Sequence, residues 1–306
     1  MNREAIIECV PNFSEGTDVT KVRRIVAAMQ VEGVRLLDWS LDKAHNRSVV
    51  TIAGPPEAVV ESAVRASGKA AELIDLTKQT GVHPRIGAAD VIPFIPVSGA
   101  TLAECALLAR QAGLLIWRRY GVPVYFYGAA AARPDRVQLE DVRKGQFEGL
   151  RDAVPKDAAR RPDIGGPELH ETAGASAVGA RSFLIAYNVH LHEPDVTAAR
   201  AIARDIRASG GGLHGVKALG VLANGRAQVT MNITDHRATP MPKVYSRLEE
   251  LARRHGAHLE DSELIGLIPQ DAYEQNAEWI VRIPNFDPEQ KVLERRLERP
   301  LEWEKD

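Results

Sequence analysis

The feature that most constrains the fold is an order of strands and helices that the chain uses twice. Strands are recognised by β-branched residues with alternating polarity, and helices by apolar residues at helical spacing. In the first half the predicted elements are strand 5–13, helix 18–30, strands 34–38 and 48–53, helix 57–76 and strand 91–96. In the second half they are strand 183–191, helix 196–208, strands 216–222 and 227–234, helix 241–255 and strand 262–267. Both halves therefore follow the order β-α-β-β-α-β.

This order is the split βαβ arrangement of ferredoxin-like domains. We therefore expect an α+β protein in which two ferredoxin-like subdomains, with mixed or antiparallel sheets and helices on one face, form an α/β sandwich. The expected boundaries are residues 1–180 for the first subdomain and 181–306 for the second. The halves share this pattern without readable sequence identity, and Asn224-Gly225 is predicted to form the hairpin turn of the second half.

A segment of different character separates the two halves. It contains a predicted helix at 102–120, a strand at 122–127 and a charged, proline-containing region at 133–171. That region is either a simple connection between subdomains or a functional loop, since long connections in compact proteins often carry function. The tail at 288–306 is rich in Glu, Lys and Arg and is expected to be a solvated helix or a frayed end.

The composition excludes several classes of protein. With 39 Lys and Arg against 41 Asp and Glu, the chain has no basic excess of the kind that drives general nucleic-acid binding. Cys9 and Cys105 form neither a close pair nor a Cys/His cluster, which argues against a disulfide framework and a zinc site. No stretch reaches the ~18 apolar residues of a membrane span, and acidic groups near the N-terminus do not fit a secretory signal. We therefore expect a cytoplasmic protein that binds no nucleic acid, membrane or metal.

The chemistry is expected in the run at 81–97, GVHPRIGAADVIPFIPV. Pro84 favours an extended conformation at His83, so the imidazole is held on a short, rigid segment. Histidine exchanges protons near neutral pH more readily than other side chains, which makes His83 the candidate catalytic residue. The alternative is a structural histidine in a loop. Arg85 and Asp90 follow in the same run.

A series of motifs runs through the first 190 residues: ECVPNFSEG at 8–16, NRSV at 46–49, HPRIG at 83–87, DVIPFIP at 90–96, VPVY at 122–125, PDIGGP at 162–167 and GARSFLIAYN at 179–188. These motifs, in this order, resemble those of the glutamate formimidoyltransferase family, in the form that lacks a cyclodeaminase domain. The second half is covered more loosely, by QVTMNITD at 228–235 and LIGLIP at 264–269. This many ordered matches make coincidence improbable.

The resemblance implies transfer of the formimidoyl group from N-formimidoyl-L-glutamate to N5 of tetrahydrofolate, a late step of histidine degradation. Tetrahydrofolate is then the cosubstrate, these two small molecules are the expected partners, and a homodimer is implied. The family's catalytic histidine corresponds to His83, which suits a general acid and shuttle that protonates the departing glutamate nitrogen. The family's folate-contacting stretch corresponds by position to Gly166, Pro167, Glu168, Leu169, His170, Glu171, Thr172, Ala173 and Gly174.

Four further residues are candidates for substrate contacts. Arg85 and Asp90 either orient the imidazole or hold the glutamate carboxylates, since arginine grips a carboxylate through two parallel hydrogen bonds. Structural salt bridges are an equal alternative for both. His45 and Arg47 lie at the first hairpin turn, and they either face the same cleft or form an exposed polar turn.

Two other functions fit the same sequence. A formyl group has an oxygen where a formimidoyl group has a nitrogen, and the two groups are otherwise the same. The sequence therefore fits formyl transfer between N-formylglutamate and tetrahydrofolate, or from 5-formyltetrahydrofolate, as well as formimidoyl transfer. A non-catalytic folate-binding module is the other alternative, because a fold alone does not dictate an activity. The HPR segment at 83–85 weighs against the non-catalytic module.

Overall fold

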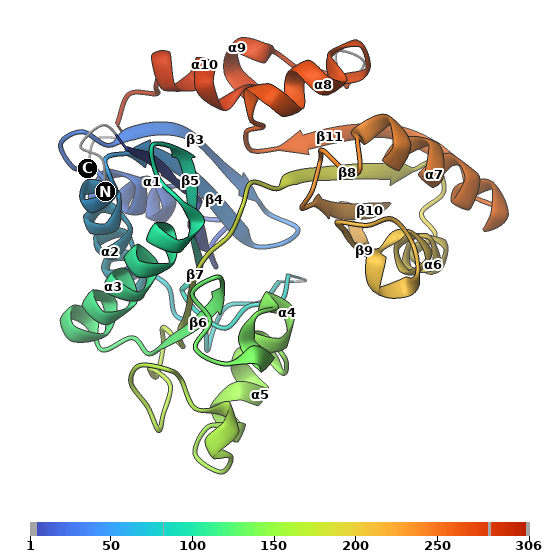
Figure 1. The fold of residues 1–306 in the computed structure, drawn as a ribbon. Coiled ribbons are helices and arrows are strands. Elements are labelled where there is room, and N and C mark those ends of the chain that lie inside the picture. The colour runs from blue at the N-terminus through green and yellow to red at the C-terminus, as the bar shows by residue number, and fades with distance from the viewer. Residues whose placement is uncertain (1–4, 82, 281–282, 304–306) are drawn as a thin grey trace. The chain divides into compact units, whose positions relative to one another are not determined.

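The structure is a computed structural model that describes residues 5–81, 83–280 and 283–303, and these residues divide into two compact units (Figure 1). Unit 1 extends to Ser182 and also contains the segment that starts at Pro300, whereas unit 2 is Phe183–Arg299. The last described residues, which the sequence placed with the second half, lie with unit 1. There the amide of Leu301 donates a hydrogen bond to the carbonyl of Leu36 at 2.7 Å.

Unit 1 contains the predicted β-α-β-β-α-β order. Its elements are β1 (Ile6–Cys9) with the short continuation β2 (Asn12–Phe13), α1 (Val19–Ala28), β3 (Arg35–Asp42), β4 (Arg47–Gly54), α2 (Pro56–Leu73) and β5 (Ala89–Ser98). The strand expected at 5–13 is thus two strands, interrupted at Val10 and Pro11. Strand β3 pairs with β4, β4 pairs with β1 and β2, and both of these pair with β5, always antiparallel. This is the ferredoxin-like strand order expected from the sequence.

A second group of elements extends the sheet of unit 1 beyond β5. They are α3 (Leu102–Tyr120), β6 (Val124–Gly128), α4 (Leu139–Val142), α5 (Gln146–Ala153) and β7 (Ser176–Ala180). Strand β7 lies between β5 and β6 and is parallel to both. The sequence predicted α3 and β6 but no strand at β7, because SAVGA consists mostly of small residues with little β propensity.

Burial on both faces explains why such a plain sequence forms a strand. Helices α1, α2 and α3 cover one face of the sheet of unit 1 (Figure 1). Ile92 of β5 and Val178 of β7 lie in this helix-covered core, whereas Val91 and Ala177 lie in a smaller core with Val142 of α4. Parallel strands are typically covered on both faces, so β7 shows no alternation of polar and apolar residues.

Unit 2 repeats the order in its simplest form. Its elements are β8 (Ile185–Leu191), α6 (Val196–Ile206), β9 (Val216–Ala223), β10 (Arg226–Ile233), α7 (Met241–Arg254) and β11 (Leu259–Ile265). The strands pair antiparallel in the order β11-β8-β10-β9. Asn224 and Gly225 join β9 to β10 with φ angles of 51° and 77°, which confirms the predicted two-residue turn. The protein is therefore an α+β protein with two ferredoxin-like units.

The two units also share the residues that start their helices. Asp18 in the sequence Asp-Val-Thr precedes α1, and Asp195 in the same tripeptide precedes α6. In each case the aspartate caps the helix by accepting hydrogen bonds from the amides two and three residues later. Helices α2 and α7 both have a proline as the N-cap residue and a second proline within their first two positions. The duplication is therefore visible in the helix starts as well as in the pattern of elements.

The charged tail contributes to the core of unit 2. Helices α8 (Gln270–Ile280), α9 (Pro288–Lys291) and α10 (Leu293–Glu298) follow β11. Val292 is fully buried in the core of unit 2, together with Ala272 and Ile280 of α8, and the neighbouring Leu293 is fully buried as well. The expectation of a solvated or frayed tail was therefore wrong up to Glu298, because one apolar pair among many charges anchors it. Residues 304–306 lie outside the described residues.

Replacing Leu293 by alanine tests this contribution. Leu293 is fully buried, and a Leu→Ala change in a packed core costs about 2–5 kcal/mol of unfolding free energy. Glu298→Ala, at the exposed end of the same helix, is the matched control and is expected to cost less than about 0.5 kcal/mol. Urea unfolding followed by circular dichroism measures both variants. Equal stability of the two would show that the tail is not part of the core.

Candidate active site

Of the residues expected to carry the chemistry, His83 and Arg85 lie in the loop at 74–88, which joins α2 to β5, and Asp90 lies in β5. Both ends of this loop are held by the segment that precedes β7. Leu76 donates its amide to the carbonyl of Thr172 at 2.8 Å, and Ala88 donates its amide to the carbonyl of Ala173 at 2.9 Å. Because β5 and β7 are parallel neighbours, the segments that lead into them meet at the same edge of the sheet.

Asn46 fastens the hairpin turn between β3 and β4 to this loop. Its side chain accepts a hydrogen bond from the amide of Gly16 at 2.9 Å and donates one to the carbonyl of Thr80 at 2.7 Å. The side chain of Gln79 donates a hydrogen bond to the carbonyl of Asn46 at 3.0 Å. The turn, the loop and the segment before α1 are thus joined through one asparagine.

His83 lies against the hairpin turn. Nη1 of Arg47 donates a hydrogen bond to Nε2 of His83 at 2.6 Å. The ring of His45 lies edge-on to the ring of His83, with centroids 6.1 Å apart. Gly81 permits this approach, because a Cβ atom there would lie 2.7 Å from the backbone oxygen of His45. The structure thus brings together His83, His45 and Arg47, three of the predicted site residues.

The surroundings of His83 keep its imidazole neutral. Burial lowers the pKa of His83 from 6.5 to about 2, and the charges of Arg47, Arg143 and His45 act in the same direction. A hydrogen bond to the backbone of Pro84 opposes this shift in part. Since proline has no N–H, its carbonyl accepts and the imidazole donates. Nε2 is the acceptor for Arg47, so the proton of the neutral ring resides on Nδ1.

Arg143 is a site residue that the sequence analysis missed. It follows α4 and forms a salt bridge with the buried carboxylate of Asp90. Asp90 also accepts a hydrogen bond from the amide of Ile86 at 2.7 Å. The charge of Arg143 contributes to the low pKa of His83. Nothing in the surrounding charged segment distinguishes this arginine from its neighbours, so only the tertiary fold identifies it.

Arg85 forms its hydrogen bonds inside the protein. Nε donates to the side-chain oxygen of Gln79 at 2.5 Å, and Nη2 donates to the Gln79 carbonyl at 2.8 Å and to the carboxylate of Glu148 at 2.9 Å. The residue is 7% exposed. These contacts favour the structural alternative for Arg85, in which it holds the loop against α5.

His45 is oriented by Asp42 at the other end of the hairpin turn. Nδ1 of His45 lies 2.6 Å from one carboxylate oxygen of Asp42, and the His45 amide donates to the other oxygen at 3.0 Å. Burial raises the pKa of Asp42, but the hydrogen bonds from His45 outweigh it and lower that pKa below its usual value. The carboxylate is therefore engaged by His45.

The stretch predicted to contact folate divides into an open part and an anchored part. The exposed members are Gly166, Pro167, Glu168 and Glu171, the half-buried members are Leu169, His170 and Thr172, and the buried members are Ala173 and Gly174. A cis peptide bond joins Gly166 to Pro167. His170 and Gly174 exchange two backbone hydrogen bonds of 2.9 Å, which closes a tight loop. The anchored part contains the carbonyls that hold the His83 loop, and the open part leaves side chains and backbone accessible.

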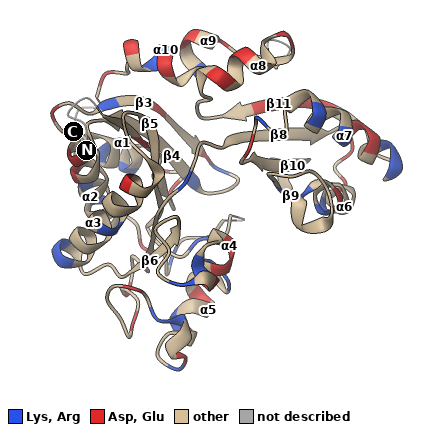
Figure 2. Ribbon diagram, in the orientation of Figure 1, with Lys and Arg blue, Asp and Glu red and all other residues tan. Residues whose placement is uncertain are grey.

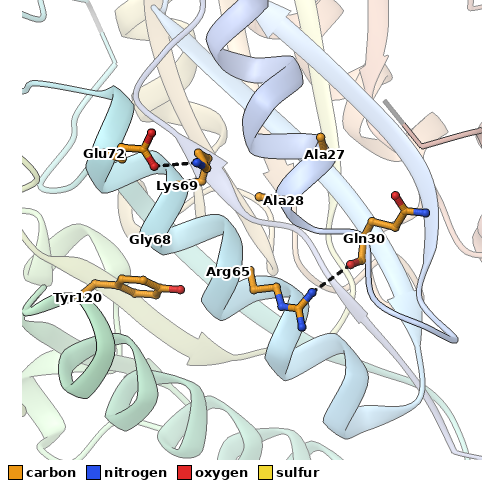
Figure 3. Close-up of a pocket in the computed structure, with 8 residues that line it drawn as sticks. All are labelled: Ala27, Ala28, Gln30, Arg65, Gly68, Lys69, Glu72 and Tyr120. Atoms are coloured by element: carbon orange, nitrogen blue, oxygen red, sulfur yellow. Dashed lines mark hydrogen bonds and ion pairs between the residues drawn. The ribbon is translucent and has the colours of Figure 1, made fainter. Parts of the chain in front are cut away.

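A cavity of about 680 Å³ in unit 1 contains none of the predicted site residues. It is lined by Ala27, Ala28, Gln30, Arg65, Gly68, Lys69, Glu72 and Tyr120 (Figure 3). Its two cationic side chains are already paired, Lys69 with Glu72 at 2.7 Å and Arg65 with Glu61 at 2.9 Å. We assign this cavity no part in the chemistry of His83.

The excess of arginine at His83 is local. Basic and acidic residues are interspersed on the helices of both units (Figure 2), and the net charge of the chain is only −2. Within the described ranges, no helix has the length and apolar character to cross a bilayer, and no group of three or more His, Cys, Asp or Glu side chains is arranged to hold a metal ion.

The fold and the site define a two-unit α+β protein whose first unit holds a neutral histidine beside arginine side chains, an arrangement suited to proton transfer on an anionic small molecule. Residues 6–181 match the family model of the formiminotransferase domain, N-terminal subdomain, and residues 186–296 match that of the formiminotransferase domain. The chain belongs to the formiminotransferase family.

Similar curated proteins cover the chain almost completely. The glutamate formimidoyltransferase of Streptococcus pyogenes serotype M1 is 41% identical, over 95% of this chain and 98% of its own. That of Thermoplasma acidophilum is also 41% identical, over 98% of this chain and 100% of its own. The formimidoyltransferase-cyclodeaminase of Rattus norvegicus is 39% identical over 87% of this chain, which corresponds to 51% of the longer protein.

The neutral state of His83 predicts a pH dependence of stability. The unfolded chain takes up a proton at His83 near pH 6.5, whereas the folded chain does so only near pH 2. The unfolded state therefore binds more protons throughout this window, and the free energy of unfolding falls as the pH drops through it. His83→Gln keeps an acceptor for Arg47 but does not titrate, so we expect this variant to lose less stability than the wild type between about pH 6.5 and pH 5.

Chemical denaturation at a series of pH values measures this difference. The matched control is His192→Gln, which replaces an exposed histidine of unit 2. Parallel pH profiles for the wild type and His83→Gln would contradict the low pKa of His83.

Proposed function

We propose that the protein transfers the formimidoyl group of N-formimidoyl-L-glutamate to N5 of tetrahydrofolate, giving 5-formimidoyltetrahydrofolate and L-glutamate in histidine degradation. The observation that carries this proposal is the match, over nearly the whole length of both chains, to relatives named glutamate formimidoyltransferase. Tetrahydrofolate acts as the cosubstrate in this reaction.

The transfer requires a group that moves one proton between two nitrogens. N5 of the folate loses its proton when it attacks the formimidoyl carbon, and the glutamate nitrogen must gain a proton when the tetrahedral centre collapses. A neutral imidazole performs both steps in turn, first as a base and then as an acid, with no net consumption of protons. We assign this role to His83, and its neutral state supports a start as the base.

The contacts around His83 support different roles for the other predicted residues. Arg47 contacts His83 directly and is assigned to substrate binding. Asp90 positions Arg143, and Arg85 positions the loop through Glu148. His45 is assigned to substrate binding beside His83, because the two rings are in contact.

Folate binding is assigned to the stretch Gly166–Gly174 in unit 1. Its exposed part offers accessible groups, and its anchored part is hydrogen-bonded to the two ends of the loop that carries His83. Unit 1 then supplies both the proton shuttle and the folate-contacting stretch, while unit 2 supplies the second formiminotransferase subdomain.

A homodimer and a cytoplasmic location are also part of this proposal. Both rest on the family resemblance, and the two buried free cysteines, Cys9 and Cys105, fit a reducing compartment. Light scattering coupled to size-exclusion chromatography tests the dimer.

The proposed reaction is tested by assaying formimidoyl transfer to tetrahydrofolate in the wild type and in His83→Gln. General acid–base catalysis contributes roughly 10²–10⁴-fold, so kcat is expected to fall by that factor in the variant. Folate affinity is expected to stay within a few-fold. His192→Gln, at an exposed site in unit 2, is the matched control and should keep wild-type activity.

The same assay separates the alternative functions. Undiminished turnover by His83→Gln would remove His83 from the mechanism. Faster turnover of N-formyl-L-glutamate than of the formimidoyl donor would favour formyl transfer, and folate binding without turnover of either donor would favour a non-catalytic module.

A further inference from the structure

The duplication provides an internal comparison for Arg47. Arg47 is the first residue of β4, and Arg226 is the first residue of β10, the corresponding strand of unit 2. Arg226 donates hydrogen bonds to Glu260 at 2.7 Å and to Asp261 at 3.0 Å, and these carboxylates raise its pKa. Arg47 donates instead to the neutral ring of His83 at 2.6 Å, and burial lowers its pKa to about 10. The same position thus meets carboxylates in one unit and an uncharged ring in the other.

Two guanidinium groups act on His83, and among the described residues one of them has an unused hydrogen-bond donor. Arg47 and Arg143 both act on His83 as cations, and Asp90 forms a salt bridge with Arg143. Nε of Arg143 is buried and has no hydrogen-bond partner in the part of the chain that the structure describes. A single anionic group that contacts both guanidinium groups would give Arg143 Nε an acceptor and Arg47 a charged partner.

We propose that Arg47 and Arg143 bind a carboxylate of the glutamate moiety of the donor, and that this binding turns Arg47 away from His83. The inference rests on the proposed function, because the two carboxylates of that donor are the anions that the site would receive. Arginine binds a carboxylate through two parallel, charge-assisted hydrogen bonds, which are stronger than one bond to a neutral imidazole. Donor binding is therefore coupled to release of the histidine.

The released atom is the one that the reaction needs. While Arg47 donates to Nε2 of His83, the lone pair of that nitrogen is not available for a proton. Once free, Nε2 takes the proton of N5 as the bond between N5 and the formimidoyl carbon forms. It returns the proton to the glutamate nitrogen as the bond between that nitrogen and the carbon breaks. The guanidinium groups neither gain nor lose a proton.

A carboxylate at this position also makes His83 a stronger base. The charges that act on His83 are those of Arg47, Arg143 and His45, and the charges of Asp90 and Asp42 act on Arg47 in turn. An added negative charge within about 4–6 Å opposes the effect of the arginines and raises the pKa of His83 toward its ordinary value. The donor then activates the base that its own transfer requires.

L-Glutamate, the product that keeps both carboxylates, is the probe for the first test. Nitrogen-15 NMR of the histidine rings is recorded in the wild-type protein with and without saturating L-glutamate. We expect the Nε2 signal of His83 to shift and its pKa to rise by about one unit or more. Glutamate binding that leaves both ring nitrogens of His83 unchanged would overturn the release of His83. The absence of binding at concentrations on the order of 10 mM would overturn the carboxylate subsite.

A variant of Arg143 tests the subsite by calorimetric titration with L-glutamate. Arg143→Gln is expected to weaken binding by about tenfold or more. The matched control is Arg119→Gln, on α3 of the same unit, where the arginine pairs with Glu61. Wild-type affinity in Arg143→Gln would exclude Arg143 from the subsite.

A second variant separates a loss of L-glutamate binding from a loss of folding. Removal of Arg143 alone leaves Asp90 buried without its partner, and an unpaired buried charge is strongly destabilising. The double variant Arg143→Gln with Asp90→Asn removes both charges and is expected to fold. Its affinity for L-glutamate is expected to be lower than that of the wild type, as in the single variant. Wild-type affinity in this folded variant would overturn the proposal.

None of these measurements depends on turnover, so they separate this inference from the proposed function. If the protein does not transfer formimidoyl groups and L-glutamate nevertheless releases His83, the proposed reaction fails and the carboxylate switch stands. If transfer proceeds while L-glutamate leaves His83 bonded to Arg47, the reaction stands and the switch is refuted.

Discussion

The pairing of β7 with β5 is the constraint on which the geometry of the site depends. The amide of Ala175, next to β7, donates to the carbonyl of Ile86 at 2.9 Å, just before β5. Gly174 has a φ of 68°, and a Cβ atom there would lie 2.1 Å from the same carbonyl oxygen. Only glycine allows the two segments to approach so closely. The ends of the loop that carries His83 are therefore fixed by backbone contacts, and the loop needs no regular structure of its own to hold an imidazole in place.

The two units show how one scaffold acquires a site in one copy. Asn46 lies in the turn between β3 and β4 and Asn224 in the corresponding turn between β9 and β10, with φ angles of 47° and 51°. In unit 2 the turn has two residues and ends in Gly225, so it only connects strands. In unit 1 the turn is longer, and the side chain of Asn46 bonds to Gly16 and Thr80 instead. The extra residues of this turn include His45, which thereby comes to lie beside His83.

The elements with a strong local signal were predictable from the sequence, and the parts that depend on tertiary packing were not. Helix α3 was predicted at 102–120 and has these bounds, because its apolar periodicity and its capping box at Thr101 are local properties. Strand β7 has no such signal, since burial on both faces replaces side-chain alternation. The buried pair Val292 and Leu293 was not predicted either, because its neighbours in the sequence are charged and its burial depends on tertiary packing.

The site followed the same division between local and tertiary information. The run around His83 and the hairpin turn with His45 and Arg47 were found from the sequence, and the structure brings these three residues together. That Arg85 would pair with Glu148 of α5, and that Arg143 after α4 would pair with Asp90, depends on where α4 and α5 pack. Charged residues in a loop look alike in a sequence. Their partners are decided by elements that lie far away in the chain.

The neutral state of His83 gives the arginines two functions in a single arrangement. In the free protein they keep the imidazole uncharged and occupy its acceptor nitrogen. A folate that enters alone then meets a histidine whose base function is suppressed, so N5 keeps its proton. In the proposed complex the donor carboxylate compensates the positive charge of the two arginines. The pKa of His83 therefore rises, and Nε2 becomes a stronger base. Among the described residues, the Arg47 guanidinium forms an ion pair with no carboxylate and donates to His83 instead. A carboxylate of the donor fills this position in the proposed complex, so the acid–base chemistry of His83 depends on the donor.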